Sequence, residues 1–288
     1  MEFSSVEELA DWIETSLVVA TPKTLGIDRL NFLARAELNA GEATVSSALA
    51  VMQNRAKVLG DDYPFGVNAV SVSSIRTSSR VPYLTLLFMS PGSPWRQIAP
   101  ADELSDTASR FEELVRDGLS NFWGKGGQAL LFGYPSKEGR PQEFSQAVRW
   151  LADIVGLRVG VGYRPPRRKD GGVDVVAWRP FRDGRSGFPI LLAQATIQKE
   201  TFTKTSDIDS RLWASWLAMD VDPLRALCLP GTVRRQGPEW DQLSSVVLVL
   251  DRIRIIELIR RGSSSSIDPT WIEQRIAKLR SVMLAAEI

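Results

Sequence analysis

Two polar residues interrupt runs of the sequence that are otherwise apolar. Asp174 lies in the run VDVVAW at 173–178, and Gln194 lies in the run ILLAQAT at 190–196. Such runs are typical of central strands covered on both faces, where an uncompensated carboxylate is costly. If the faces that carry the two residues coincide, a carboxylate and an amide carbonyl converge, and a cation is the simplest compensation for them.

The expected cation is Mg²⁺, or Mn²⁺ in its place. Magnesium accepts one or two carboxylates, keeps several waters and is completed by substrate phosphates. It can generate a nucleophile from water and neutralise charge on a phosphodiester. A lysine nearby would orient the attacking water or stabilise the transition state. The two polar residues therefore indicate chemistry on phosphates.

The composition narrows the chemistry by exclusion. The 288 residues include no histidine and one cysteine, Cys228. Disulfides within the chain, Cys/His zinc sites and mechanisms of the Ser-His-Asp or Cys-His kind are thereby excluded. Carboxylates, Lys, Tyr, Ser, Thr or a hard cation held by oxygen atoms remain. The formal charge of +1 sets up no global field that would select nucleic acid or membrane.

The segments around the two runs predict the elements that position them. Residues 142–155 have the apolar spacing of a helix that Gly156 would end. The predicted fold class is mixed α/β, and its core is one helix, three strands, a second helix and a fourth strand. These elements are expected at 142–155, 158–163, 173–178, 190–196, 207–219 and 226–229.

The rest of the chain is predicted to be mostly helical. Before the core we expect helices at 27–40, 42–59 and 101–121 and a strand at 83–88. After it we expect a strand at 245–250 and helices at 252–261 and 269–286, joined by a serine-rich linker. The expected domains are an N-terminal docking or regulatory region at 1–135, the α/β core at 136–261 and a C-terminal helix at 262–288.

The sequence KDGGVDVVA at 169–177, followed by a strand that ends in AQA at 193–195, resembles the PD-(D/E)xK nuclease superfamily. It is most similar to Mrr-type restriction endonucleases, whose strands carry DGGxD and then QAK. The resemblance covers about residues 140–230 and implies a restriction-endonuclease-like αβββαβ core. It also implies that Asp174 binds the metal and that Gln194 faces it.

Two positions depart from the family pattern. The lysine expected two residues after Gln194 is replaced by Thr196, and the nearest lysine is Lys199. The first helix of the family often carries Phe-Glu, whereas Ser145 follows Phe144 here, so Glu143 is the candidate for that metal-binding acid. The predicted catalytic set is therefore Asp174, Gln194, Lys199 and Glu143. The departures are either migrated catalytic groups or marks of lost activity.

A basic turn precedes the second predicted strand of the core. Clustered cations of this kind can contact a nucleic-acid backbone, and the alternative is a solvated loop. The predicted contact residues are Arg164, Arg167, Arg168 and Lys169. Asp170 is interpreted as a turn residue beside them.

The resemblance implies a metal-dependent nuclease that hydrolyses DNA phosphodiester bonds in a bacterial restriction or anti-phage defence system. Near-zero net charge argues against tight autonomous DNA binding, so a protein partner in a defence complex is also expected. The alternative is a catalytically inactive nuclease-fold subunit for nucleic-acid binding or complex assembly. The sequence shows neither a membrane span nor the basic start of a signal peptide, so cytoplasmic localisation is expected.

Overall fold

The computed structural model of the chain describes residues 5–20, 23–75, 81–135, 139–162, 164–166, 169–235, 237–262 and 267–285. It divides into two compact units. Unit 1 comprises Met1–Thr107, Pro230–Arg234 and Ile267–Ile288, and unit 2 comprises Ala108–Leu229 and Arg235–Ser266. This division differs from the boundaries expected after residues 135 and 261, because the chain leaves unit 1 within a long helix and returns to it twice.

Unit 1 combines helices with a small antiparallel sheet whose strand order is β1-β3-β2. The hydroxyl of Ser5 accepts a hydrogen bond from Glu8 N and so caps the first helix. The predicted helices at 27–40 and 42–59 are confirmed. The elements are α1 (Val6–Val19), β1 (Thr24–Gly26), α2 (Ile27–Leu38), α3 (Glu42–Leu59), η1 (Gly60–Asp62), β2 (Phe65–Val67), β3 (Ser71–Ser74), α4 (Val81–Met89), α5 (Trp95–Ile98), the start of α6 (Ala101–Ser120) and α11 (Pro269–Ala285).

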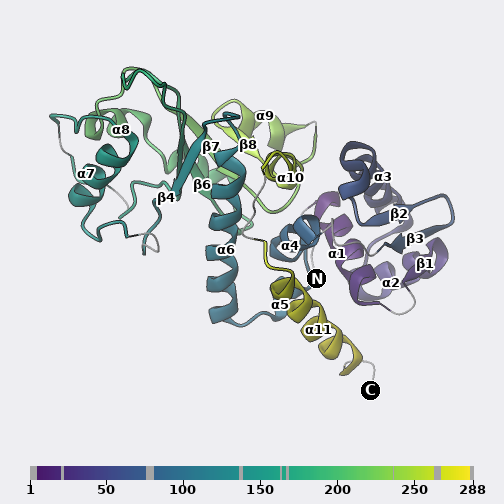
Figure 1. Ribbon diagram of the computed structural model, residues 1–288. Helices are drawn as coiled ribbons and strands as arrows, with labels where there is room; N and C mark the ends of the chain where they lie inside the picture. Colours follow the sequence, from purple (N-terminus) through teal and green to yellow (C-terminus); the bar gives the residue numbers. More distant parts are fainter. Residues whose placement is uncertain are drawn as a thin grey trace. The chain divides into compact units, whose positions relative to one another are not determined.

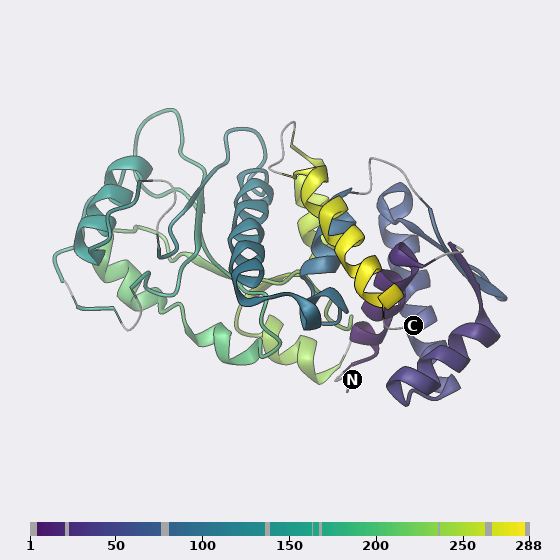
Figure 2. The same cartoon turned by 90° about the horizontal axis from the view of Figure 1, so that it is seen from below.

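The strand predicted at 83–88 is wrong, because these residues lie in helix α4. Nearly every side chain of α4 is apolar and most are buried. A run that is apolar on all sides has no periodicity that separates a buried strand from a buried helix. The packing decides the matter, since α4 contacts both α1 and α11 (Figure 2).

Unit 2 is built on a five-stranded mixed sheet with the order β4-β5-β6-β7-β8. The first three strands of this order pair antiparallel, whereas β6–β7 and β7–β8 pair parallel. Figure 1 shows α6 beside this sheet. The strands are β4 (Gln128–Leu131), β5 (Val175–Trp178), β6 (Ile190–Ala195), β7 (Leu224–Cys228) and β8 (Leu248–Leu250).

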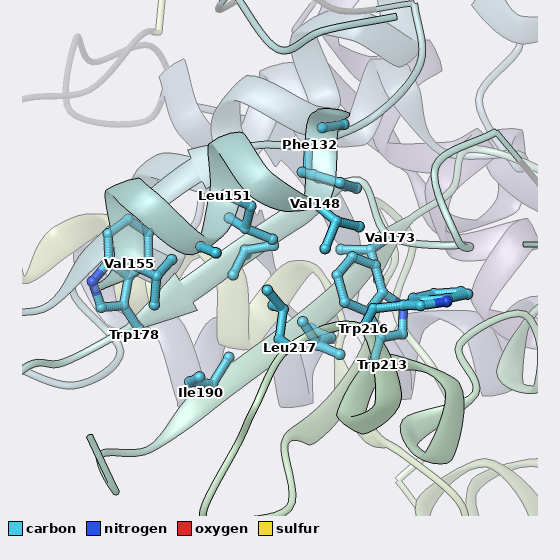
Figure 3. Packing of buried hydrophobic residues seen from close by; sticks show 14 of the residues in the cluster. Phe132, Val148, Leu151, Val155, Val173, Trp178, Ile190, Trp213, Trp216 and Leu217 are labelled. Atoms are coloured by element: carbon cyan, nitrogen blue, oxygen red, sulfur yellow. The ribbon is translucent and has the colours of Figure 1, made fainter. Parts of the chain in front are cut away.

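Helices of unit 2 bury the faces of this sheet. The amphipathic helix α7 packs its apolar side onto Val176, Trp178 and Leu192 in one core cluster (Figure 3). Trp213 and Trp216 of α8 add edge-to-face ring contacts with Phe144, at centroid distances of 6.2 and 4.6 Å. The further elements are α7 (Phe144–Val155), η3 (Phe202–Ser206), α8 (Ser210–Trp216), α9 (Pro238–Ser244) and α10 (Arg252–Arg260).

The strand predicted at 158–163 is also wrong within its described part. Only Val159 pairs, as an isolated bridge to Leu217, and Val161 is fully exposed. Gly160 lies so close to α8 that an added Cβ would stand 2.0 Å from Ser215 O. The segment therefore lies against α8, and β4 occupies the first strand position of the sheet. The strand beside β5 at the edge of the sheet is β4, and the helix that precedes β4 in the chain is α6.

Candidate active site

Asp174 lies immediately before β5, where its side chain reaches the end of β6. Its backbone N donates to Ala193 O at 2.9 Å, and its Oδ2 accepts a hydrogen bond from Ala195 N at 2.7 Å. Burial raises the pKa of Asp174 well above its ordinary value, and the charge of Glu112 raises it further. The hydrogen bond from Ala195 and the charge of Lys204 act in the opposite direction without outweighing these two causes.

The DGG sequence before Asp174 forms a turn that only glycine permits. Gly172 has φ +80°, and an added Cβ would stand 2.2 Å from Asp207 O. Gly171 has φ +65° and lies against the rings of Trp213 and Trp216. Asp170 Oδ1 accepts from Gly172 N at 2.8 Å, which agrees with its interpretation as a turn residue. The turn therefore brings the start of β5 into contact with the segment that contains Asp207.

Gln194 has an orientation that the surrounding charges dictate. Its Nε2 donates to Asp207 Oδ2 at 2.8 Å. The amide nitrogen therefore faces Asp207, and the carbonyl oxygen points away from it. Gln194 is 6% exposed, and no described residue donates to its Oε1. A buried carbonyl oxygen without a donor is the kind of group that a cation would satisfy.

A second carboxylate approaches Asp174 from helix α6. A Cβ added to Gly133 would stand 3.4 Å from Asp174 Oδ1 and 3.6 Å from Glu112 Oε2. The two carboxylates thus flank one small space that the missing side chain of Gly133 leaves open. The sequence analysis did not single out Glu112. This residue follows Phe111 in the helix predicted at 101–121, and the two form the Phe-Glu pair that the resemblance led us to expect at Phe144.

Asp174 and Gln194 line a cavity of about 160 Å³ at the end of β6. The described residues that line it include Asp170, Asp174, Gln194 and Lys204, together with Ala108, one helical turn before Glu112 on α6. We call this space the carboxylate pocket. Its polar groups come from β5, β6 and η3, and the second carboxylate stands beside it on α6.

The structure brings Lys204, rather than Lys199, to this pocket. Lys199 is exposed in the loop after β6 and is not among the described residues that line the pocket. Lys204 lies in η3, with a side chain 16% exposed and its Nζ 3.9 Å from Asp207 Oδ2. No pattern in the sequence singles out Lys204, because η3 is a short turn reached through an irregular loop.

Glu143 lies outside the pocket and serves as the N-cap of α7. Its side chain is exposed and accepts hydrogen bonds from Ser145 N at 3.0 Å and Gln146 N at 2.8 Å. The hydroxyl of Ser145 also donates to it, and these bonds lower the pKa of Glu143. The structure therefore gives Glu143 a helix-capping role, and the acid that stands near Asp174 is Glu112 of α6.

Thr196 is buried at the position where the sequence resemblance predicts a lysine. Its Oγ1 accepts a hydrogen bond from Gln198 N at 3.2 Å, and the residue lines the carboxylate pocket. The side chain thus holds the turn that leaves β6. Among the described residues that line the pocket, the lysine is Lys204.

The described part of the basic turn is exposed. Arg164 and Lys169 are both exposed, and Lys169 Nζ lies 4.5 Å from the centroid of the Tyr134 ring. Arg167 and Arg168 lie outside the described residues. The turn leads directly into Asp170 and the DGG sequence, so its exposed cations lie next in the chain to the carboxylate pocket.

The donor set suits a hard divalent cation with few protein ligands. Two carboxylates and one amide carbonyl without a donor are the oxygen ligands that magnesium uses when substrate phosphates and water complete its shell. The described residues contain no group of three or more His, Cys, Asp or Glu side chains arranged to hold a metal. The fit therefore rests on the raised pKa of Asp174, the orphan Oε1 of Gln194 and the space at Gly133.

No family model, no curated protein and no solved structure matches the chain. Among the described residues, no helix is both long and apolar enough to pass through a bilayer.

Proposed function

We propose that unit 2 is a metal-dependent nuclease that hydrolyses DNA phosphodiester bonds. The observation that carries the proposal is that Asp174 and Gln194, with its orphan carbonyl, line one pocket together with Lys204, while Glu112 stands near Asp174 across the space at Gly133. A bound Mg²⁺ would neutralise charge on the phosphodiester and lower the pKa of water. The expectation of a bacterial restriction or anti-phage role belongs to this proposal, and so does a protein partner.

The order of the elements supports the proposal. The chain runs from α6 through β4, β5 and β6 to α8 and β7, with the first three strands antiparallel and the fourth parallel to the third. This is the helix, three-strand, helix, strand order of the nuclease-like core that the DGGxD resemblance implies. In this proposal α7 is an insertion between β4 and β5, and the core would begin at α6 rather than at residue 142.

Each residue of the pocket has a stated role in the proposal. Asp174 and Glu112 would hold the cation, and Gln194 would complete the protein ligands through Oε1. Asp207 would orient Gln194, because it fixes the amide nitrogen. Lys204 would stabilise negative charge on the reacting phosphate in place of the lysine that Thr196 replaces.

The proposal is tested by cleavage of supercoiled plasmid DNA and of single-stranded DNA and RNA with Mg²⁺, Mn²⁺ or EDTA. We expect cleavage of DNA that requires the divalent ion and is lost in Asp174→Asn, Glu112→Gln and Lys204→Gln. Matched controls are Glu143→Gln and Lys199→Gln, which change the same residue types outside the pocket. If the controls lose activity and the pocket variants retain it, the site is placed wrongly.

A second candidate function is a nuclease-fold subunit that binds nucleic acid or a partner without cleaving. The observation that favours it is the hydrogen bond of Thr196 to Gln198 N, because a structural side chain occupies the lysine position. This candidate predicts no cleavage by the wild-type chain in any metal. If Mg²⁺ also fails to raise the thermal stability of the wild-type chain, the metal-dependent enzyme is excluded.

A further inference from the structure

Two consecutive helices of unit 1 are joined in a way that is typical of a DNA-reading motif. Helix α2 ends at Leu38, Asn39 takes the left-handed conformation with φ 52°, and α3 begins at Glu42. The link is thus three residues long and contains Gly41, and the two helices contact each other. Short links with glycine between packed helices are found in the helix-turn-helix motif, whose second helix reads the major groove.

The exposed face of α3 has an unusual composition for a surface helix. Its buried side chains follow a helical spacing and pack toward α1 and β2; they are Val45, Ala48, Met52, Arg55 and Leu59. Between Glu42 and Lys57 the only charged residue is Arg55, which is buried. A solvated helix face normally carries alternating Glu and Lys, so the lack of charge over most of α3 needs another explanation.

The side chains on this face match the edges of base pairs. Ser46, Ser47, Gln53 and Asn54 are all exposed, and a helical projection places them on one side of α3 with Ala50 between them. Gln and Asn can form paired hydrogen bonds with adenine, and Ser can bond to several bases. Small residues such as Ala50 allow the helix backbone to approach the floor of the groove.

A hairpin beside the motif supplies a second contact. Strands β2 and β3 follow α3 after the short helix η1, and β2 contacts α3 (Figure 1). The tip is ordered by Asn68, whose Oδ1 accepts from Val70 N at 2.9 Å and Ser71 N at 2.8 Å. Val70 at this tip is 73% exposed, although it is apolar. An ordered tip with an exposed apolar side chain suits contact with a sugar or a groove wall.

We propose that unit 1 binds duplex DNA, with α3 in the major groove and the β2–β3 hairpin against the adjacent backbone. The inference does not depend on the nuclease proposal for unit 2. Arg29 and Arg35 of α2 are balanced by Asp28 and Glu37, so base contacts rather than charge would supply most of the binding. Affinity should accordingly depend on sequence and only modestly on salt.

The test is selection from a pool of duplex DNA with a randomised core, using the full-length wild-type chain in EDTA. We expect one short sequence to be enriched and to bind more tightly than the starting pool. The double variant Gln53→Ala/Asn54→Ala should lose this preference, with about 5- to 150-fold weaker binding for each paired contact removed. Lys57→Ala should weaken all sequences alike and lower the salt slope by about one.

Two further variants separate recognition from folding. Ser47→Glu adds a negative charge to the exposed face of α3 and should weaken binding at least about tenfold by repelling phosphates. Gln274→Ala changes an exposed glutamine on α11 of the same unit and should bind like wild type. All variants should melt within a few degrees of wild type.

Several outcomes overturn the proposal. The first is enrichment of the same sequence by wild type and by Gln53→Ala/Asn54→Ala. The second is that the chain retains none of the duplex pool. The third is that the chain binds only single-stranded DNA or RNA. Failure of plasmid cleavage leaves the proposal standing, because the selection is carried out without a divalent ion. The two proposals therefore fail separately.

Discussion

In unit 1, Asp11 and Glu14 are buried around one cation, Arg55, whose Nη1 lies 2.8 Å from an oxygen of each. Glu14 also accepts hydrogen bonds from Tyr63 and Tyr83, both at 2.7 Å. In unit 2, the buried Asp174 has one backbone donor on its carboxylate and a second carboxylate, Glu112, as its neighbour.

The difference shows in the protonation of each cluster. Burial pulls the pKa of Arg55 down, but the charge of Glu14 and its neighbours outweighs this and keeps the guanidinium charged. Burial and Glu112 both push the pKa of Asp174 upward instead. In the unit 1 cluster an arginine lies in direct contact with both carboxylates, whereas in the unit 2 cluster the charge of Lys204 lowers the pKa of Asp174 without outweighing burial and Glu112. A strongly raised carboxylate pKa beside a pocket is the kind of site where a ligand is expected.

The largest expected effect comes from removing the cation of unit 1. Arg55→Met would leave Asp11 and Glu14 buried without compensation, so we expect a loss of about 3–5 kcal/mol in the free energy of unfolding. Urea denaturation measures this loss, and Arg35→Met on the exposed side of α2 is the matched control. A loss below about 1 kcal/mol would contradict the view that this buried cluster stabilises unit 1.

Asp174→Asn should abolish most of the cleavage without lowering the stability of the fold. Asparagine can still accept from Ala195 N but adds no charge beside Glu112, so stability without divalent ion should equal or exceed that of wild type. Cleavage should fall at least about 100-fold. Loss of a residue that only supports a metal ligand costs roughly 10- to 100-fold, and Asp174 is proposed as a ligand itself. Asp153→Asn, on the exposed side of α7, is the control for both measurements.

The raised pKa of Asp174 also predicts a pH dependence with a definite sign. The folded state keeps the proton at pH values where the unfolded state has lost it, so stability falls as pH rises from the ordinary aspartate pKa through the raised one. Thermal melts of wild type and Asp174→Asn should therefore diverge over this window, with wild type the less stable at its upper end. Parallel curves would show that Asp174 is not perturbed.

Gly133→Ala tests the space between the two carboxylates. The added methyl group would stand at ordinary contact distance from Asp174 and Glu112, so stability should change by less than about 1 kcal/mol. Cleavage should fall about tenfold or more, because the methyl group takes the space that the cation needs. Gly162→Ala has nothing within 4 Å and should leave activity unchanged. Equal activity in both variants would remove the cation from this space.

The smallest effect is expected at Glu143. Glu143→Ala removes the cap of α7, which should lower the melting temperature slightly and leave cleavage as in wild type. Because hydrogen bonds lower the pKa of Glu143, its contribution is present above its unfolded-state pKa and disappears as pH falls through the lowered one. A large loss of cleavage in this variant would indicate that Glu143, at the start of α7, is the metal-binding acid.

The sequence predicted some parts of the fold well. The helices at 27–40, 42–59, 101–121 and 142–155 have clear apolar spacing or end signals, and the structure contains each of them. It missed α4, because a uniformly apolar run carries no period, and it placed a strand at 158–163 where glycines let the chain lie against α8. Those two errors share a cause, since contact with another element decided the outcome.

By itself, the sequence predicted that the apolar runs carrying Asp174 and Gln194 pair as neighbouring strands, because two such runs joined by a short turn pair with each other; Asp174 itself lies immediately before β5. It also determined which chemistry is excluded, since no histidine is present. Only the tertiary structure decided that Glu112 stands beside Asp174 and that Lys204 lines the pocket in place of Lys199. Those residues meet through helix–sheet and loop packing across 30 to 92 positions, and local periodicity carries no information about such contacts.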